Sequence, residues 1–487
     1  MPGCLSTKHR ARAICTGRPE LSTGRHGLRR SGPERPRAPY VTTLRPVRRA
    51  EDREILRLAV PAFLALVAEP LFLLTDAAIV GHLGTPELAG LGIAAVVLQT
   101  AVGLCVFLAY GTTAAVARHL GAGDTRRAMA QGVDGVWLAV VIGAVVTVGG
   151  VLGTTPLVAA FGTGPEVAAQ AETYLRLAFL GTTPLLVMLA TTGILRGLQD
   201  TRTPLVVAVA GNLLNVVLNV LLVYGLDLGI AGSAIGSVLA QVASAAALLA
   251  VVVRAARREG APLRPDLPGI RAAGRAGVPL VVRTLTLRAA LLVTTYAVTL
   301  GVVGGAQDVD LATHQLAMTL WTFLAFVLDA IAIAAQALTG RALGAGDLAG
   351  TRATTRRMLQ WGVGAGVVTG LGLAAVSPVL GRLFTDDPAV AERLVPVLLV
   401  AALGQPVAGV VFVLDGVLIG AGDGVYLAWG GVATLLVYAP VALLAAPTGG
   451  LVLLWVGFSA VFMGARLVVL VARARGDAWM VTGPARA

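Results

Sequence analysis

The chain is poor in charged, aromatic and sulfur-containing residues. Charged residues make up 13% of its 487 residues, aromatic residues 5%, and there are three cysteines. A soluble domain carries about 25% charged and about 45–50% apolar residues, whereas 56% of this chain is apolar. Cys4, Cys15 and Cys105 have neither disulfide nor metal-ligand spacing. The composition therefore excludes an ordinary soluble domain, a disordered chain and a disulfide scaffold.

The chain also lacks the motifs of common catalytic sites. We find no Ser/His/Asp arrangement, no HExxH, no CxxC and no paired Asp-rich metal motif. The phosphate-binding pattern GxxxxGK[ST] is absent as well, which argues against ATP-driven transport by this chain alone. We therefore expect no enzyme, no catalytic residues, no metal site and no bound cofactor.

The positive charge is concentrated at the N-terminus. The formal net charge is +12, but residues 1–50 hold 12 basic and two acidic residues, a net of +10. The other 437 residues hold 26 basic and 24 acidic residues, a net of +2. Residues 1–50 have no apolar run to bury and are predicted to be a disordered basic tail, or to reflect a mis-assigned start. No nucleic-acid partner is expected.

Long apolar runs fill the rest of the chain. About 20 apolar residues are needed to cross the ~30 Å core of a bilayer, and the runs predict twelve spanning helices. The first, about residues 55–80, is interrupted by Glu69 and Asp76; the run 424–465 is divided at residues 446–450. Basic residues lie mostly in alternate loops, so both termini are predicted to be cytoplasmic. We expect a multi-pass plasma-membrane protein, most simply a monomer in the lipid bilayer.

An internal repeat relates the two halves of the chain. Residues 118–124 recur at 341–347 with six of seven positions identical, and residues 193–200 align with 416–423, both at an offset of 223. Six helices per half make this a parallel repeat, a plan known from secondary transporters. The repeated Gly-x-Gly-Asp loops are interpreted as turns whose aspartates cap the next helix; a phosphate cradle is the alternative.

The repeat sets the predicted domain boundaries. After the tail come an N-lobe at 51–253, a cytoplasmic inter-lobe loop at 254–275, a C-lobe at 276–475 and a C-terminal tail at 476–487. The fold class is thus all-α, with twelve transmembrane helices in two six-helix repeats.

Ionisable groups inside spans are expensive and are functional candidates. Glu69 and Asp76 are seven residues apart, so they share a face of the first helix, and Pro61 can bend that helix. A carboxyl group in a low-dielectric environment can exchange a proton near neutral pH. Asp76 is the preferred ion-coupling candidate and Glu69 the second; an interfacial or structural role is the alternative for each.

Further polar side chains lie in later spans. Asn212, Asn215 and Asn219 form a stripe on the fifth helix, which predicts either a polar cavity or interhelical hydrogen bonds, and Ser237 on the sixth helix can join it.

In the second half, Arg283 is predicted to pair with Asp329 or Asp415, in a structural or gating role.

Four segments resemble the multidrug and toxic compound extrusion (MATE) transporters, and the DinF-like branch in particular. Residues 61–84 resemble the family's first helix, 193–201 its loop after helix four, 212–219 its helix-five motif and 314–344 its helix eight. The resemblance covers about residues 51–475.

The resemblance implies a V-shaped bundle that exports cationic or amphipathic small molecules in exchange for inward H⁺ or Na⁺. Asp76 would be the coupling carboxylate, Asn215 and Ser237 its neighbours, and Pro61 the bend that responds to protonation. Many members have Asp at the position of Asn219, so a two-carboxylate site is in doubt and H⁺ is favoured over Na⁺. A lipid-precursor flippase or a metabolite exporter of the same superfamily is the alternative.

Overall fold

The computed structural model describes residues 44–300 and 307–484, which are arranged as helices joined by short turns. Short 3₁₀ or π segments (η) continue some of the α-helices. In chain order the elements are α1 (Leu44–Gly81), α2 (Thr85–Leu104), α3 (Phe107–Gly121), α4 (Thr125–Ala159), α5 (Pro165–Ala178), η1 (Phe179–Gly181), α6 (Thr182–Gly197), α7 (Arg202–Val220), η2 (Leu221–Gly225), α8 (Gly229–Arg258), α9 (Leu267–Leu300), α10 (Gln307–Gly344), α11 (Leu348–Phe384), α12 (Pro388–Gly420), α13 (Gly424–Val456), η3 (Gly457–Phe462) and α14 (Met463–Arg475).

Within the described residues, twelve helical segments are long and apolar enough to cross a bilayer, as predicted. Some of them combine two elements: α2 and α3 form the second segment, and α5, η1 and α6 form the fourth. The predicted division near residues 446–450 is also present, because the backbone leaves helical geometry at Gly450, where φ is 67°. Large apolar side chains point outward, with Leu152 79% and Leu403 81% exposed. Such outward-facing apolar surface suits lipid rather than water.

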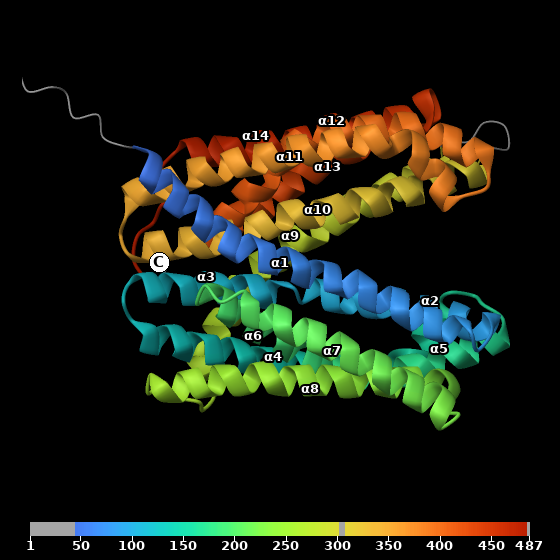
Figure 1. Ribbon diagram of the computed structural model, residues 1–487, viewed down its shortest axis with the longest axis horizontal. Helices are drawn as coiled ribbons and strands as arrows, with labels where there is room; N and C mark the ends of the chain where they lie inside the picture. The colour runs from blue at the N-terminus through green and yellow to red at the C-terminus, as the bar shows by residue number, and fades with distance from the viewer. Residues whose placement is uncertain (1–43, 301–306, 485–487) are drawn as a thin grey trace, which may run out of the picture. The chain divides into compact units, whose positions relative to one another are not determined.

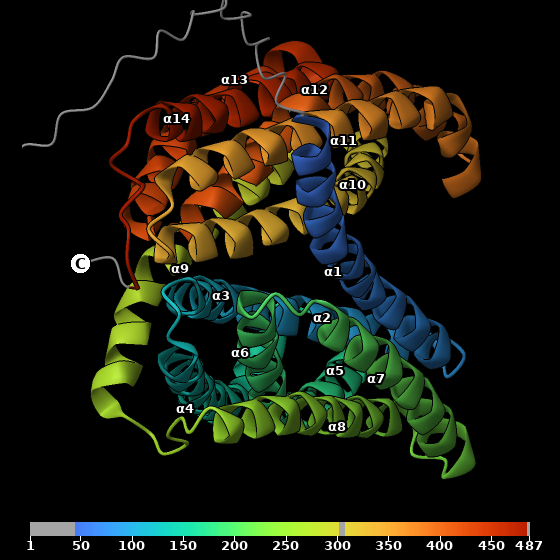
Figure 2. The ribbon, with the colours of Figure 1, turned by 60° about the vertical axis from the view of Figure 1, so that its left-hand side comes forward.

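Residues 47–487 form one compact unit, whereas residues 1–46 belong to a separate one whose described part is the first turn of α1. Within residues 47–487, Figures 1 and 2 show two groups of helices, a first group of α2–α8 and a second group of α9–α14. α1 contacts both groups. Near its start Asp52 binds Arg357 of α11 at 2.6 Å, and farther along the carbonyl of Ala68 accepts a hydrogen bond from Asn212 of α7 at 2.7 Å.

The repeat is visible in the packing. Gly193 of α6 lies against the Ala109 carbonyl of α3, and 223 residues later Gly416 of α12 lies against the Ala332 carbonyl of α10. A Cβ at either glycine would come within 2.6 Å and 2.3 Å of these oxygens, so both crossings need glycine. The aspartates also cap helices as predicted: Asp124 accepts from the Arg127 N–H and Asp347 from the Gly350 N–H.

Three predicted boundaries differ from the structure. Residues 1–43 of the predicted disordered tail lie outside the described residues, but Leu44–Ala50 are already part of α1. The predicted loop 254–275 is shorter, because α8 continues to Arg258 and α9 begins at Leu267. Arg and Ala are good helix formers, so helices extend past the apolar runs on which the boundaries were based. The predicted C-terminal tail is partly packed, with Trp479 only 2% exposed.

Candidate functional site

A buried carboxylate lies at the centre of a polar network in the first helix group. Asp76 of α1 is 2% exposed. It accepts hydrogen bonds from the Tyr174 hydroxyl of α5 at 3.0 Å, from the Asn219 amide of α7 at 2.8 Å and from the Ser233 hydroxyl of α8. Among the described residues, no ion pair includes Asp76. Neutral dipoles from three other helices therefore hold this carboxylate in place of a cation.

The network continues along α7 and α8. Asn215 donates to the Ser237 hydroxyl at 3.0 Å and exchanges longer contacts with Asn219 at 3.3 and 3.5 Å. All three side chains are at most 4% exposed. α8 passes close to α7 here, since a Cβ at Gly236 would be 2.1 Å from Oδ1 of Asn219. The close approach fixes the amide that contacts Asp76.

The structure brings together some of the predicted first-half residues and separates others. Asp76, Asn215, Asn219 and Ser237 form one network. Asn212 lies on the same face of α7 as Asn219 but two turns away, so it reaches the Ala68 carbonyl and not Asp76. Pro61 lies inside α1 and is buried, far along the helix from the network.

Glu69 does not join the network around Asp76. Its side chain is exposed, and its electrostatic partner is Arg288 of α9 in the second helix group. Two helical turns separate it from Asp76, about 10 Å along the axis. Glu69, the second ion-coupling candidate, therefore lies outside the Asp76 network.

Two donors to Asp76, Tyr174 and Ser233, were not among the residues predicted from the sequence. Ser233 precedes Ser237 by four residues, so both lie on one face of α8, and this spacing could have identified it. Tyr174 has no such signal, because its position depends on how α5 packs against α1.

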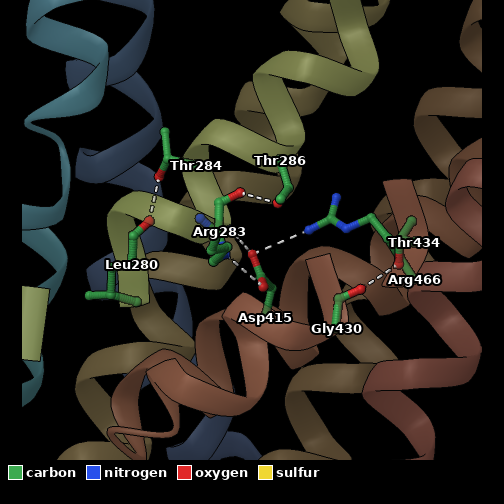
Figure 3. A network of polar contacts seen from close by, with 8 residues as sticks. All are labelled: Leu280, Arg283, Thr284, Thr286, Asp415, Gly430, Thr434 and Arg466. Atoms are coloured by element: carbon green, nitrogen blue, oxygen red, sulfur yellow. Dashed lines mark hydrogen bonds and ion pairs between the residues drawn. The ribbon is translucent and has the colours of Figure 1, made fainter. Parts of the chain in front are cut away.

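A second polar cluster lies in the second helix group (Figure 3). Arg283 of α9 binds Asp415 of α12 through two guanidinium nitrogens, and Arg466 of α14 contacts the same carboxylate at 3.4 Å. These three side chains are 9–11% exposed. Of the two predicted partners of Arg283, Asp415 is the one that hydrogen-bonds it. Arg466 was missed, because it directly follows a charge-free run.

Asp329 of α10 extends this cluster towards the first helix group. It interacts electrostatically with Arg283 and with Arg196, which lies on α6. The guanidinium of Arg283 is also 5.8 Å from the ring centroid of Tyr110 on α3. The cluster therefore lies where the two helix groups meet.

The two groups are joined at the end that carries the repeated Gly-Ala-Gly-Asp turns, residues 121–124 and 344–347, which we term the GAGD end. A Cβ at Gly121 would be 2.0 Å from the Arg341 carbonyl, and a Cβ at Gly344 would be 2.0 Å from the Arg118 carbonyl. The contact is thus reciprocal and follows the repeat. No larger residue fits at either glycine while the helices are this close.

Arginine side chains reinforce the GAGD end. Arg118 donates to the Ala421 carbonyl of the second group at 3.1 Å, and Arg341 donates to Gln199 of the first group at 2.7 Å. The C-terminal segment adds to the junction: Arg118 also donates to the Val481 carbonyl, and the Gly483 N–H donates to the Leu343 carbonyl.

A helical membrane protein with two repeats, closely joined at one end and with buried charged networks inside, belongs to the class of multi-pass membrane transporters. Comparison with known proteins specifies the family. The MatE family model matches residues 61–221 and 285–444. The chain belongs to the MatE family, as its sequence motifs indicated, and it is therefore an efflux transporter and not an enzyme.

Individual relatives agree with this assignment. Protein DETOXIFICATION 44, chloroplastic, of Arabidopsis thaliana is 34% identical over 434 residues, covering 85% of this chain and 80% of the relative. DNA damage-inducible protein F of Escherichia coli (strain K12) is 31% identical over 304 residues, covering 61% and 65%. The Vibrio cholerae MATE transporter VcmN in the bent form superposes with a TM-score of 0.80 at 21% identity, covering 88% of this chain and 97% of that chain.

Proposed function

We propose that the chain is a secondary antiporter that exports cationic or amphipathic small molecules in exchange for inward H⁺, with Asp76 as the coupling carboxylate. The observation that supports this most is the environment of Asp76, which is 2% exposed and bound by three neutral donors. A carboxylate without a fixed cation partner can take up a proton without leaving another charge unpaired.

The chemistry of the network favours H⁺ over Na⁺. A hard metal cation is bound by several oxygen ligands that point their lone pairs at it. Here Tyr174, Asn219 and Ser233 instead direct hydrogen-bond donors at Asp76. Asn219 adds no second negative charge. A proton needs one oxygen of Asp76, which this arrangement provides.

Protonation of Asp76 changes the contacts of α1. The ionised carboxylate links α1 to α5, α7 and α8 through three hydrogen bonds. Hydrogen bonds to charged groups contribute about 1.5–3 kcal/mol each, roughly twice the contribution of neutral ones. Neutralisation weakens all three, so proton binding shifts the balance between arrangements of α1. Substrate and proton are coupled if they prefer different arrangements.

Alternating access requires the GAGD end to open. The excess of basic residues in the loops at this end supports assigning it, together with both termini, to the cytoplasmic side of a plasma membrane. In the proposed cycle a single chain opens in turn to each side, and the reciprocal contacts of Gly121 and Gly344 separate when the cytoplasmic side opens.

The test is transport by the purified chain in proteoliposomes with an imposed pH gradient. Asp76→Asn removes the titratable group but keeps a similar shape, so we expect loss of gradient-driven dye export with normal membrane insertion. The control is Asp227→Asn, the same substitution at an exposed turn position where Asn tolerates the positive φ of 53°. Export by Asp76→Asn at the rate of the control would rule out the coupling role.

A further inference from the structure

The cluster around Arg283 and Arg466 lies outside the hydrogen-bond network of Asp76. It borders a small cleft in the second helix group, lined by both arginines together with Leu287, Leu427, Gly430 and Thr434. The lining comes from α9, α13 and α14, and apart from the two arginines and Thr434 it is apolar. Figure 3 shows the two guanidinium groups approaching Asp415 from different helices.

The charges of this cluster do not balance. Arg283 and Arg466 share the single carboxylate of Asp415. The neighbouring acid, Asp329, also faces Arg196, so three arginines stand against two aspartates and leave a net charge of +1. Buried charge is costly unless it is paired. An unbalanced cation beside a cleft is therefore a binding feature for an anion.

Arg466 has donors available for such an anion. A guanidinium carries five N–H donors in a planar fork. Among the described residues, the hydrogen-bond acceptor of Arg466 is Asp415, reached by one nitrogen at 3.4 Å, and its flat face lies 5.8 Å from the ring of Phe462. The side chain is nevertheless 11% exposed. The edge of the fork that does not face Asp415 can receive the oxygen atoms of a ligand.

We propose that this cleft binds a carboxylate group of the exported molecule, with Arg466 and Arg283 as the binding residues and Asp415 as the counter-ion that holds them in place. Planar guanidinium groups bind carboxylates through paired hydrogen bonds. The apolar side chains of the lining, Leu287 and Leu427 among them, contact the adjoining carbon atoms. The proposal rests on the proposed efflux function and narrows its substrates to amphipathic molecules with an anionic group.

The location of the cluster fits this role. The Arg283 guanidinium lies over Tyr110 of the first helix group, so a ligand bound here touches the junction between the groups. Asp76 lies in the interior of the first group. The proton and the substrate carboxylate therefore bind at separate sites. Binding at one site affects the other by changing the relative position of the two helix groups.

Two dyes that differ in one group test the site. Rhodamine B carries a free carboxylate, and in its ethyl ester that group is esterified. Binding to the purified full-length chain in nanodiscs is measured by fluorescence polarisation. We expect the acid to bind about tenfold or more tightly than the ester, the size expected for a charge-assisted hydrogen bond. Equal binding of the two dyes, or no binding of either, would overturn the proposal, and this comparison needs no variant to fold.

Single-residue variants then test whether Arg466 is responsible for the preference for the acid. Arg466→Gln is expected to abolish the preference for the acid, and Arg466→Lys to keep part of it, because it keeps the charge but not the planar fork. The control is Arg473→Gln on the same helix, which also removes an arginine paired with an aspartate, Asp423, but lies outside the cleft. Loss of the preference in the control to the same extent would contradict a role specific to Arg466.

The result is separable from the proposed antiport. If a pH gradient drives Asp76-dependent export of both dyes and the acid is not preferred in binding, the antiport stands and the carboxylate site is wrong. If the acid binds preferentially and neither dye is exported under the gradient, the carboxylate site stands and the proposed proton coupling is wrong.

Discussion

The hydroxyl of Tyr174 provides a graded test of the account, because removing it weakens the environment of Asp76 without removing the carboxylate. The hydroxyl donates to Oδ2 of Asp76 at 3.0 Å, and the ring is 5% exposed within the first helix group. Tyr174→Phe deletes this one donor and keeps the packing of the ring. Asn219 and Ser233, both bound to Oδ1, remain in place.

The expected magnitude follows from that single bond. A hydrogen bond to a charged group contributes about 1.5–3 kcal/mol, and about 1.4 kcal/mol corresponds to one pH unit. The lost donor destabilises the ionised carboxylate and not the protonated one, so Asp76 retains its proton to higher pH. We therefore expect the midpoint of the pH dependence of dye export to move upward by about one to two units.

The assay is the initial rate of rhodamine B export from proteoliposomes over a series of pH values, with equal amounts of reconstituted protein. Tyr224→Phe is the matched control. This substitution also removes a tyrosine hydroxyl that donates to α1. The hydroxyl of Tyr224, however, donates to the Ile79 carbonyl, at 2.6 Å, and not to Asp76. Its midpoint is expected to stay unchanged. A midpoint for Tyr174→Phe that is unchanged or lower, or an equal upward shift in both variants, would refute the reasoning.

Two further predictions concern the second amide of the network and the GAGD end. Asn219→Asp places a carboxyl group within 2.8 Å of Oδ1 of Asp76; because like charges oppose double ionisation, the export midpoint should move to higher pH, and an unchanged pH profile would contradict this. Gly121→Leu cannot coexist with the Arg341 carbonyl, so spin-label distances across the GAGD end should lengthen, whereas Gly372→Leu, at an unobstructed position, should leave them unchanged.

Patterns that depend on one helix were predictable from the sequence. The twelve segments follow from apolar length, and the repeat follows from two motifs at one offset. The face shared by Asn215 and Asn219 follows from helical spacing, and the aspartate caps follow from the turn motif.

Patterns that depend on how helices pack were not predictable in the same way. Tyr174 reaches Asp76 only because α5 packs beside α1. Asn212 shares a face of α7 with Asn219 but lies two turns away along the helix. Spacing within α7 does not show which residue of α1 it contacts, and the structure shows that this residue is Ala68. Trp479 was placed in a tail because its few apolar neighbours cannot span a membrane, yet it is buried in the folded chain. The partner of Arg283 likewise depended on which of two acids the tertiary structure brings near.

The central claim is that substrate binding and protonation of Asp76 favour different arrangements of the chain, and proton release on substrate binding tests it most directly. The purified chain is placed in weakly buffered solution with a pH indicator, and rhodamine B is added at a pH below the export midpoint. We expect release of about one proton per bound dye by the wild-type chain and none by Asp76→Asn. Proton release of the same size from Asp76→Asn, or dye binding without release by the wild type, would contradict it.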